Sequence, residues 1–278
     1  MKIDYSKDKL LTEFSMKTLQ DRYMIPGESS PQEAFARAAT AFSDDEDHAQ
    51  RLYDYASNLW FMFATPVLSN GGTERGMPIS CFLNYVEDSR EGITDHYTEN
   101  AYLSSFGGGI GGTWSDVRSS GTRTSKGSES TGVIPFVKVV DAEMLAFSQG
   151  VTRRGSYAAY LHMSHPEIEE FLDVRKPTGG DTNRKCLNLH HAVVVPDDFM
   201  QLIHNATRTP DFDDSYNLID PHTQQTVKTV SARALWVKIL QNRMETGEPY
   251  LMFEDAVQNA LPEFQKRKGL QVHHSNLC

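Results

Sequence analysis

The amino-acid sequence predicts an α/β protein, in which a helical N-terminal region precedes a body of alternating strands and helices. Residues 1–63 carry helical periodicity and capping signals. From Thr65 onward, short apolar runs alternate with glycine-rich turns. Segments of helical length separate these runs, and strands separated by helices are typical of an α/β body rather than of a β-sandwich.

Two helices are expected in the N-terminal region. The stretch SPQE (30–33) has the pattern of a capping box with proline at the first helical position, and apolar residues then recur on one helical face. A second helix is expected over about 45–61. This region is therefore treated as a domain of its own, followed by a second domain over 64–278.

The body is expected to begin with a strand, ISCFLNYVE (79–87). Asp88 to Glu91 then offer a cap for a helix that runs to about Phe106. The other expected elements are a helix within 133–150 that ends at Gly150, a helix over 164–176 that begins at a Ser-x-x-Glu cap, a buried strand over 191–196 and an amphipathic helix over 231–247 that is closed by Gly247.

Composition and charge exclude several classes of protein. The net charge of -10 argues against coating nucleic acid, which needs a basic face. No apolar run approaches the roughly 20 residues of a membrane helix, and the N-terminus has no signal-peptide pattern. Three scattered cysteines are too few for a disulfide framework. We therefore expect a cytoplasmic protein that binds neither nucleic acid nor membrane.

The glycine-rich stretch SSFGGGIGGTW contains G-x-G-x-x-G over 107–112. A dinucleotide-binding fingerprint requires a strand before it and a helix after it. Here a helix is expected before the glycines, and no helical periodicity follows them. We interpret the stretch as a glycine turn that allows close packing of the backbone.

Two loops carry arginine among small hydroxylated residues, one over 115–131 and one over 148–160. Such loops are usually solvated connections. The alternative is an ordered loop that binds phosphate through guanidinium groups and backbone donors. Two such loops in one domain favour anion recognition.

The three cysteines differ in their surroundings. On pattern alone, Cys81 and Cys186 are interpreted as small core residues. Cys278 differs because alternate side chains of an extended chain share a face, so Asn276 would place an amide beside the thiol. The alternative is an interrupted strand with an incidental cysteine.

Six stretches together carry a resemblance to a known family. They are ATPVLSNGG (64–72), PISCFLNYVEDS (78–89), GGGIGGTWSDVRSSG (107–121), SQGVTRRGSYAAYL (148–161), HPEIEEFLDVRK (165–176) and SNLC (275–278). In this order the sequence resembles the catalytic large subunit of ribonucleotide reductase. The resemblance implies a ten-stranded α/β barrel made of two five-stranded halves, of which this chain would supply the first. It also implies that residues 1–63 hold no complete ATP cone.

The resemblance implies an active site that reduces ribonucleoside diphosphates to deoxyribonucleotides for DNA synthesis. Cys278 matches the cysteine that becomes a thiyl radical and takes a hydrogen atom from C3′ of the ribose. Asn276 matches the asparagine that binds the ribose hydroxyls. Cys81 matches one of the two thiols that deliver reducing equivalents and are reset by thioredoxin or glutaredoxin. Thr65 and Ser80 match positions that line the substrate pocket.

The resemblance also implies an allosteric site for dNTP or ATP effectors. The residues that match it are Asp88, Ser89, Arg90 and Arg118, with either Arg123 or Lys126 as a second phosphate ligand. Gln149, Arg153 and Arg154 match the loop that transmits effector identity to the substrate. Two such subunits would dimerise through helices over about 89–106 and 136–148. This chain itself is expected to hold no cofactor and no metal.

Several partners and alternatives follow from the resemblance. The radical would come from a metal-containing small subunit or, alternatively, from adenosylcobalamin. A glutamate two residues beyond the cysteine has no counterpart here, so the chain alone is expected to be inactive. We expect a split gene, an intein or a truncated sequence, with a complementary C-terminal polypeptide that completes the barrel. The alternatives are a non-catalytic dNTP-binding fragment and a decayed gene product that does not fold stably.

Overall fold

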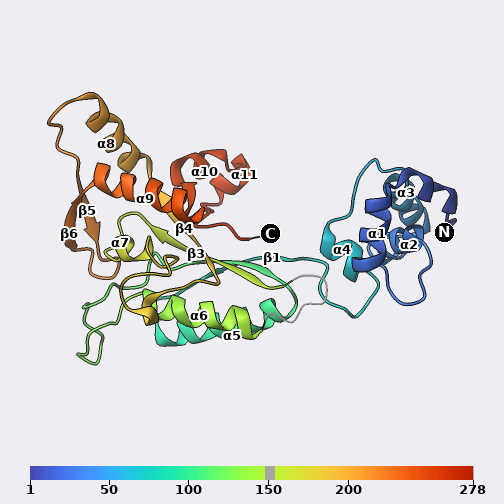
Figure 1. Ribbon diagram of the computed structural model, residues 1–278, viewed down its shortest axis with the longest axis horizontal. Coiled ribbons are helices and arrows are strands. Elements are labelled where there is room, and N and C mark those ends of the chain that lie inside the picture. The colour runs from blue at the N-terminus through green and yellow to red at the C-terminus, as the bar shows by residue number, and fades with distance from the viewer. Residues whose placement is uncertain (148–153, 278) are drawn as a thin grey trace. The chain divides into compact units, whose positions relative to one another are not determined.

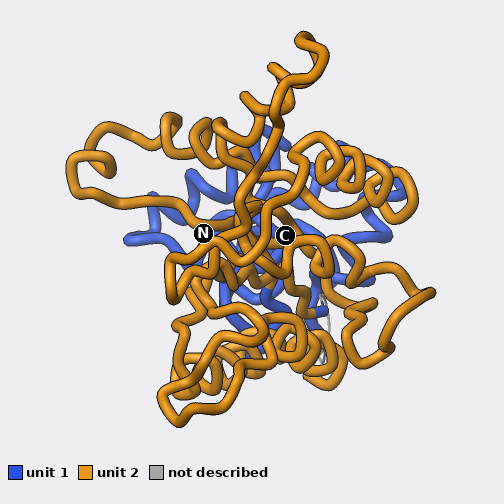
Figure 2. Tube along the Cα trace, turned by 90° about the vertical axis from the view of Figure 1, so that its left-hand side faces the viewer, with its two compact units in different colours: residues 1–80, 106–108, 149–154 blue, residues 81–105, 109–148, 155–278 orange. Residues whose placement is uncertain are grey.

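The computed structural model describes residues 1–147 and 154–277, which form two compact units (Figures 1 and 2). The helical unit is built on residues 1–80, with 106–108 and Arg154 also assigned to it. The sheet unit contains most of the remaining chain. Within the described residues, no helix is both long and apolar enough to cross a membrane.

The helical unit packs short helices around an alanine-rich core. Its elements are a 3-10 helix, η1 (Tyr5–Leu10), and the α-helices α1 (Glu13–Arg22), α2 (Pro31–Ala41), α3 (Glu46–Ser57) and α4 (Thr65–Asn70). The expected capping box is present, because the Ser30 hydroxyl accepts from the backbone of α2 and the Glu33 side chain accepts from the backbone N–H of Ser30. Phe35, Tyr53 and Leu68 are buried together in the core. The expected boundary between residues 63 and 64 falls inside this unit, just before α4.

The sheet unit is a five-stranded parallel sheet with the strand order β1-β2-β3-β4-β7. The strands are β1 (Cys81–Tyr85), β2 (Gly109–Thr113), β3 (Ser156–His162), β4 (His190–Val195) and β7 (Tyr250–Phe253). Helix α5 (Arg90–Ser105) connects β1 to β2, and α6 (Ile134–Ala146) lies between β2 and β3. The strands expected over 79–87 and 191–196 and the helix expected to reach Phe106 are therefore confirmed within a few residues.

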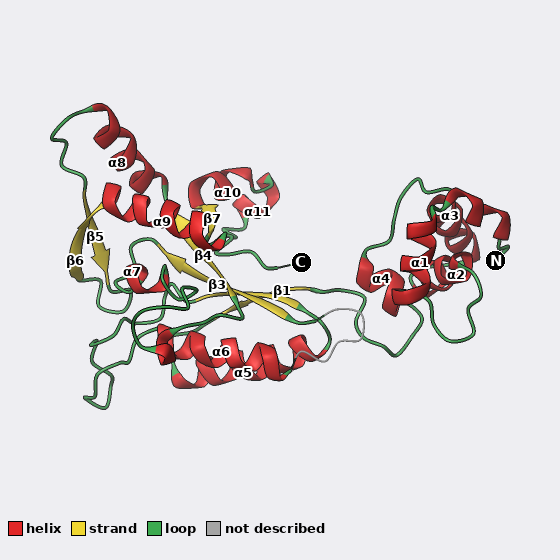
Figure 3. Cartoon of the chain, in the orientation of Figure 1, coloured by secondary structure: helices red, strands yellow, loops and turns green. Residues whose placement is uncertain are grey.

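The two faces of the sheet have different neighbours (Figure 3). In β3, Tyr157 and Leu161 join the large core that α5 and α6 cover, whereas Ala158 and Tyr160 face the opposite side. This alternation follows from the two-residue period of a strand. On the opposite side a small cluster contains Val194, Met252 and Leu277, so the last described residues lie over the face that α5 and α6 leave open.

Only the start of the glycine-rich stretch is the expected turn, where Gly107 has a φ of 75°. Gly109 to Thr113 form β2, a buried strand between β1 and β3. The expected close packing is nevertheless present at two of its glycines. A Cβ atom on Gly111 would lie 1.8 Å from the carbonyl oxygen of Ser275, and one on Gly112 would lie 2.0 Å from the hydroxyl of Tyr157. Glycine is therefore required here by the approach of two neighbouring segments rather than by a turn.

A small hairpin and further helices connect β4 to β7 and follow it. They are α8 (Asp197–Arg208), the antiparallel strands β5 (Ser215–Ile219) and β6 (Thr226–Ser231), α9 (Ala232–Thr246), α10 (Glu254–Ala260) and α11 (Glu263–Arg267). Helix α9 confirms the expected helix over 231–247, because the Ser231 hydroxyl caps its start and Gly247 closes it with a φ of 80°.

Three other expectations are wrong. The helix expected over 164–176 is only α7 (Ile168–Phe171), followed by a short 3-10 helix, η2 (Thr182–Arg184). The Ser164 hydroxyl contacts Nδ1 of His162 instead of capping a helix. The second arginine-bearing loop ends earlier than residue 160, because β3 begins at Ser156. Residues 275–277, expected to be in a strand, have no regular secondary structure and lie outside the sheet. The expected helix end at Gly150 lies outside the described residues.

A partly buried carboxyl group on α6 gives a pH-dependent prediction. Oε2 of Glu143 is buried and has no hydrogen-bond partner among the described residues. Burial raises the pKa of Glu143 from 4.5 to about 7. Between these values the unfolded chain releases the proton while the folded chain keeps it, so this group lowers stability as the pH rises through the window. Glu143→Gln should raise the thermal unfolding midpoint at pH 8 and leave it nearly unchanged at pH 4.

The matched control for this prediction is Glu99→Gln, because Glu99 is an exposed glutamate on the neighbouring helix α5. It should change the midpoint little at either pH. An equal shift of the Glu143→Gln midpoint at pH 4 and pH 8 would contradict the role given to burial.

Candidate functional site

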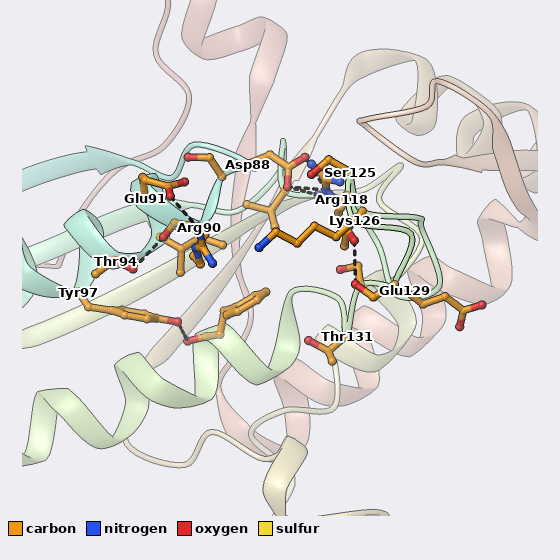
Figure 4. A pocket seen from close by; sticks show the side chains of 17 residues that line it. Asp88, Arg90, Glu91, Thr94, Tyr97, Arg118, Ser125, Lys126, Glu129 and Thr131 are labelled. Atoms are coloured by element: carbon orange, nitrogen blue, oxygen red, sulfur yellow. Dashed lines mark hydrogen bonds and ion pairs between the residues drawn. The ribbon is translucent and has the colours of Figure 1, made fainter.

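A pocket of about 670 Å³ lies between the start of α5 and the loop that follows β2 (Figure 4). It is lined by Asp88, Ser89, Arg90, Glu91, Ile93, Thr94, Tyr97, Val117, Arg118, Thr124, Ser125, Lys126, Ser128, Glu129, Ser130, Thr131 and Phe136. Apolar side chains of α5 and α6 form part of its wall, and charged and hydroxylated side chains form the rest. Such a lining suits a ligand that has both an apolar ring and an anionic group.

The α5 side of the pocket is built by a helix cap and an ion pair. The hydroxyl of Ser89 accepts from the backbone N–H of Gly92 in the first turn of α5. Nε of Arg118 donates to both carboxylate oxygens of Asp88, at 3.0 and 2.9 Å. Asp88 also lies 3.3 Å from Nδ1 of His222. Asp88 and Arg118 are mostly buried, so their orientations are fixed by packing as well as by charge.

The 119–131 loop is a hairpin that is held by its own backbone hydrogen bonds, and most of its residues are exposed. The backbone N–H of Ser130 donates to Thr122, and Thr124 donates to Ser128 across the same hairpin. Gly127 turns the tip with a φ of 82°. Figure 4 shows the side chain of Lys126 pointing from the hairpin into the space between it and α5.

The structure separates the two candidates for a second phosphate ligand. Lys126 lines the pocket, whereas Arg123 is not among the lining residues. Arg123 forms a backbone bridge with Glu129 and accepts a hydrogen bond from Arg118 through its carbonyl oxygen. The structure thus brings Asp88, Ser89, Arg90, Arg118 and Lys126 together, and it places Arg123 outside this set.

A second candidate region lies over β1 and β2, on the face that the 272–277 segment covers. Nδ2 of Asn276 donates to the carbonyl oxygen of Gly109 at 2.9 Å. Gly109 is paired in register with Cys81 on the neighbouring strand β1. The carbonyl group that holds Asn276 is therefore one strand away from Cys81, which is exposed and not the core residue that its sequence pattern suggests.

Two residues that hold the 272–277 segment, His274 and Gln258, were not predicted from the sequence. Nε2 of the buried His274 lies 3.0 Å from the carbonyl oxygen of Gly111. Because a carbonyl group only accepts, Nε2 carries the proton, and burial lowers the pKa of His274 to about 4 and keeps the ring neutral. The Gln258 amide exchanges hydrogen bonds with the backbone N–H and carbonyl group of Val272. The only feature of the sequence that could have pointed to His274 is its position two residues before Asn276.

The remaining expected site residues are distributed as follows. Thr65 and Ser80 lie in the helical unit, where the Thr65 hydroxyl is 3.1 Å from that of Tyr23 and Ser80 is buried. Arg154 is exposed. Gln149, Arg153 and Cys278 lie outside the described residues.

Cys186 is a core residue, as its sequence pattern predicts. It is fully buried, and burial raises the pKa of its thiol to about 12, so the thiol stays protonated and unreactive. In the part of the chain that the structure describes, no group of three or more His, Cys, Asp or Glu side chains is placed to hold a metal ion.

Comparisons with known proteins agree with this architecture. Residues 79–278 match the ribonucleotide reductase barrel domain, and residues 9–76 match the ribonucleotide reductase all-alpha domain. The chain is 46% identical over 276 residues to the ribonucleoside-diphosphate reductase large subunit of Invertebrate iridescent virus 6, which covers 99% of this chain and 28% of the relative. It is 47% identical over 230 residues to the putative large subunit of Frog virus 3 (isolate Goorha), which covers 83% of this chain and 38% of the relative.

A solved structure is also similar over the whole chain. It is the Actinobacillus ureae class Id ribonucleotide reductase alpha subunit, with a TM-score of 0.76, 29% sequence identity, and coverage of 100% of this chain and 46% of that subunit. The chain thus spans about half or less of the length of the relatives that it matches. The predicted fold class, a helical region followed by the first half of the reductase barrel, is confirmed. The chain belongs to the ribonucleotide reductase large-subunit family.

Proposed function

We propose that this chain forms the N-terminal part of a ribonucleoside-diphosphate reductase catalytic subunit, which reduces ribonucleotides to deoxyribonucleotides for DNA synthesis. The observation that carries this proposal is the match to both reductase domains in their order along the chain. The position of Asn276 over β2, one strand away from Cys81, supports it. The complete enzyme also needs the part of the reductase that lies outside the matched share of the relatives, whether it is in the same polypeptide or in a complementary one.

The proposed chemistry takes place at the open face of the sheet. A thiyl radical on Cys278 would take the hydrogen atom from C3′ of the ribose, so an S–H bond forms as the C–H bond breaks. The Asn276 amide would orient the ribose hydroxyls, and Thr65 and Ser80 would line the substrate pocket. Cys81 would supply one of the two thiols that reduce the sugar and leave as a disulfide, which thioredoxin or glutaredoxin then reduces.

The pocket beside α5 is proposed to bind a dNTP or ATP effector. Asp88 would accept from the sugar hydroxyl, and Arg90, Arg118 and Lys126 would hold the phosphates. Gln149, Arg153 and Arg154 would report the identity of the effector to the substrate. The apolar side chains that line the pocket, among them Ile93 and Phe136, support binding of a base beside a charged group.

Lys126→Ala tests the assignment of the second phosphate ligand. We expect dATP and dTTP to bind the full chain at least about tenfold more weakly, because one charge-assisted contact to phosphate is lost. Arg123→Ala is the matched control, because it also removes one cation from the loop. It should change the affinity less than about twofold, because Arg123 does not line the pocket. Equilibrium dialysis with labelled dNTP measures both. Equal losses of affinity in the two variants would contradict the proposal that Lys126, and not Arg123, binds the phosphate.

Two copies are proposed to dimerise through α5 and α6. Both helices present apolar side chains on their outer surfaces, since Tyr102 is 68% exposed, Val139 47% and Leu145 62%. Such side chains on adjacent helices suit burial against a second copy. The radical is proposed to come from a metal-containing small subunit, with adenosylcobalamin as the alternative. The reaction is placed in the cytoplasm, where thiols stay reduced.

Reconstitution tests the proposed function. The full chain is mixed with the missing barrel part of a close relative, a reductase small subunit and thioredoxin, and conversion of labelled CDP to dCDP is measured. We expect dCDP only when every component is present. A parallel reaction with adenosylcobalamin in place of the small subunit distinguishes the two radical sources. No dCDP in either reaction, although the chain binds dNTP, would contradict the catalytic proposal.

A further inference from the structure

A buried carboxylate outside the pocket holds one end of the pocket loop. Asp220, in the turn between β5 and β6, is only 1% exposed. Its Oδ2 accepts from the backbone N–H of Ser119 at 2.8 Å, from the Ser119 hydroxyl at 2.7 Å and from the Thr122 hydroxyl at 2.8 Å. Ser119 directly follows Arg118, and Thr122 lies in the paired part of the hairpin, where its carbonyl oxygen accepts from the backbone N–H of Ser130.

The other carboxylate oxygen fixes the turn that carries Asp220. Oδ1 accepts from the backbone N–H groups of His222 and Thr223 and from the Thr223 hydroxyl. Burial would raise the pKa of Asp220, but the hydrogen bonds donated to the carboxylate outweigh it and hold the pKa well below its ordinary value. A buried carboxylate whose oxygens are both satisfied by donors holds its neighbours in one geometry.

The same turn also reaches the α5 side of the pocket. His222, two residues after Asp220, lies 3.3 Å from the Asp88 carboxylate, to which Arg118 is also bound. The β5–β6 turn thus contacts both the residue proposed to bind the effector sugar and the loop proposed to bind its phosphates. The other end of the loop is held separately, because the backbone N–H of Val133 donates to Glu167.

We propose that Asp220 is a positioning residue of the effector pocket. It holds Ser119 and Thr122 so that Arg118 and Lys126 are oriented before the nucleotide binds. The inference rests on the proposed function of the pocket. If the bound geometry of the loop is only fractionally populated, the apparent affinity falls by that fraction. Asp220 would therefore set effector affinity without touching the effector.

Asp220→Asn tests this role in the full chain. In asparagine an NH₂ group, which cannot accept a hydrogen bond, replaces one of the two carboxylate oxygens. The contacts of that oxygen are lost, either those with Ser119 and Thr122 or those with the β5–β6 turn. We expect the dissociation constants for dATP and dTTP to rise at least about tenfold, measured by equilibrium dialysis well below the unfolding midpoint. Thr122→Val removes one of the donors and keeps the carboxylate, and it should raise them by a smaller factor. It also serves if Asp220→Asn does not fold.

Two controls separate positioning from general stability. Asp213→Asn changes a carboxylate at the start of the β5–β6 hairpin, which accepts from Ser215 and from no pocket residue among those described, so it should leave dNTP affinity unchanged. Leu235→Ala opens a cavity in the core under α9, so it should lower the unfolding midpoint and leave dNTP affinity unchanged. If Asp220→Asn and Thr122→Val both bind dNTP within twofold of the unmodified chain, the positioning role of Asp220 is overturned and the effector-site proposal still stands. Absence of dNTP binding to the unmodified chain would overturn the effector-site proposal and this inference with it.

Discussion

Replacing Cys278 with alanine is expected to abolish deoxyribonucleotide formation by the complete reductase and to leave dNTP binding to the α5 pocket unchanged. Alanine cannot form a sulfur radical, so the proposed mechanism would have no group left to take the hydrogen atom from C3′. Loss of the residue that makes and breaks the bond should lower kcat to background, by roughly a millionfold. Conversion of labelled CDP to dCDP in the reconstituted enzyme measures turnover, and equilibrium dialysis measures effector binding.

Cys186→Ala is the matched control for this prediction. It removes another thiol from the same chain, but one that is fully buried and whose pKa burial raises to about 12. We expect a small loss of stability from the cavity and no loss of the reaction itself. Turnover above background in Cys278→Ala would contradict the radical assignment. Equal loss of turnover in both variants would indicate a folding defect rather than a missing radical.

The parts of the fold that local chemistry dictates could be predicted from the sequence. The capping box at Ser30 and the glycine that closes α9 lie within one helical turn of the groups they satisfy, so their patterns are visible in the sequence. Strand β4 was predictable because its continuous apolar run suits burial on both faces.

Other elements depend on distant partners and gave no local signal. Three of the five residues of β2 are glycine, so the strand has no clear alternation of apolar and polar side chains. Its pairing with β1 and β3 makes it a strand. The Ser-x-x-Glu pattern at Ser164 was misleading, because Glu167 is used instead to accept from Val133, far earlier in the chain. A local cap competes with such tertiary contacts and loses here.

The residues of the candidate site also divide into those that the sequence indicates and those that depend on distant contacts. Asp88 and Arg118 were identified because they lie in stretches that carry the family resemblance, and Lys126 because it lies in the arginine-bearing loop over 115–131. Asp220 was not, because the Asp-Pro step indicates only a turn. Its partner Ser119 is separated from it by 101 positions in the sequence. Only the folded chain shows that this turn and the pocket loop share a carboxylate.

Gly111→Ala is expected to disable the reductase through a single added methyl group. The new Cβ would lie 1.8 Å from the carbonyl oxygen of Ser275 and 3.0 Å from Cα of Asn276, both backbone atoms that cannot rotate away. The 272–277 segment must therefore move off β2, and the contacts of His274 and Asn276 with its carbonyl groups must lengthen or break. Because a shift of about 1 Å at a reacting group costs roughly 10²-fold, we expect kcat to fall at least that far.

Stability and effector binding should respond differently from turnover. Overpacking at one position costs about 1–3 kcal/mol, which denaturant unfolding of the full chain measures, and the α5 pocket should keep its dNTP affinity. Ile110→Val is the matched control, because this neighbour on β2 points into the core on the opposite face. It should cost about 0.5–1.5 kcal/mol and leave turnover near normal. Since both variants weaken β2 and only one displaces the 272–277 segment, near-normal turnover in Gly111→Ala would mean that the contact of this segment with β2 does not position the active site.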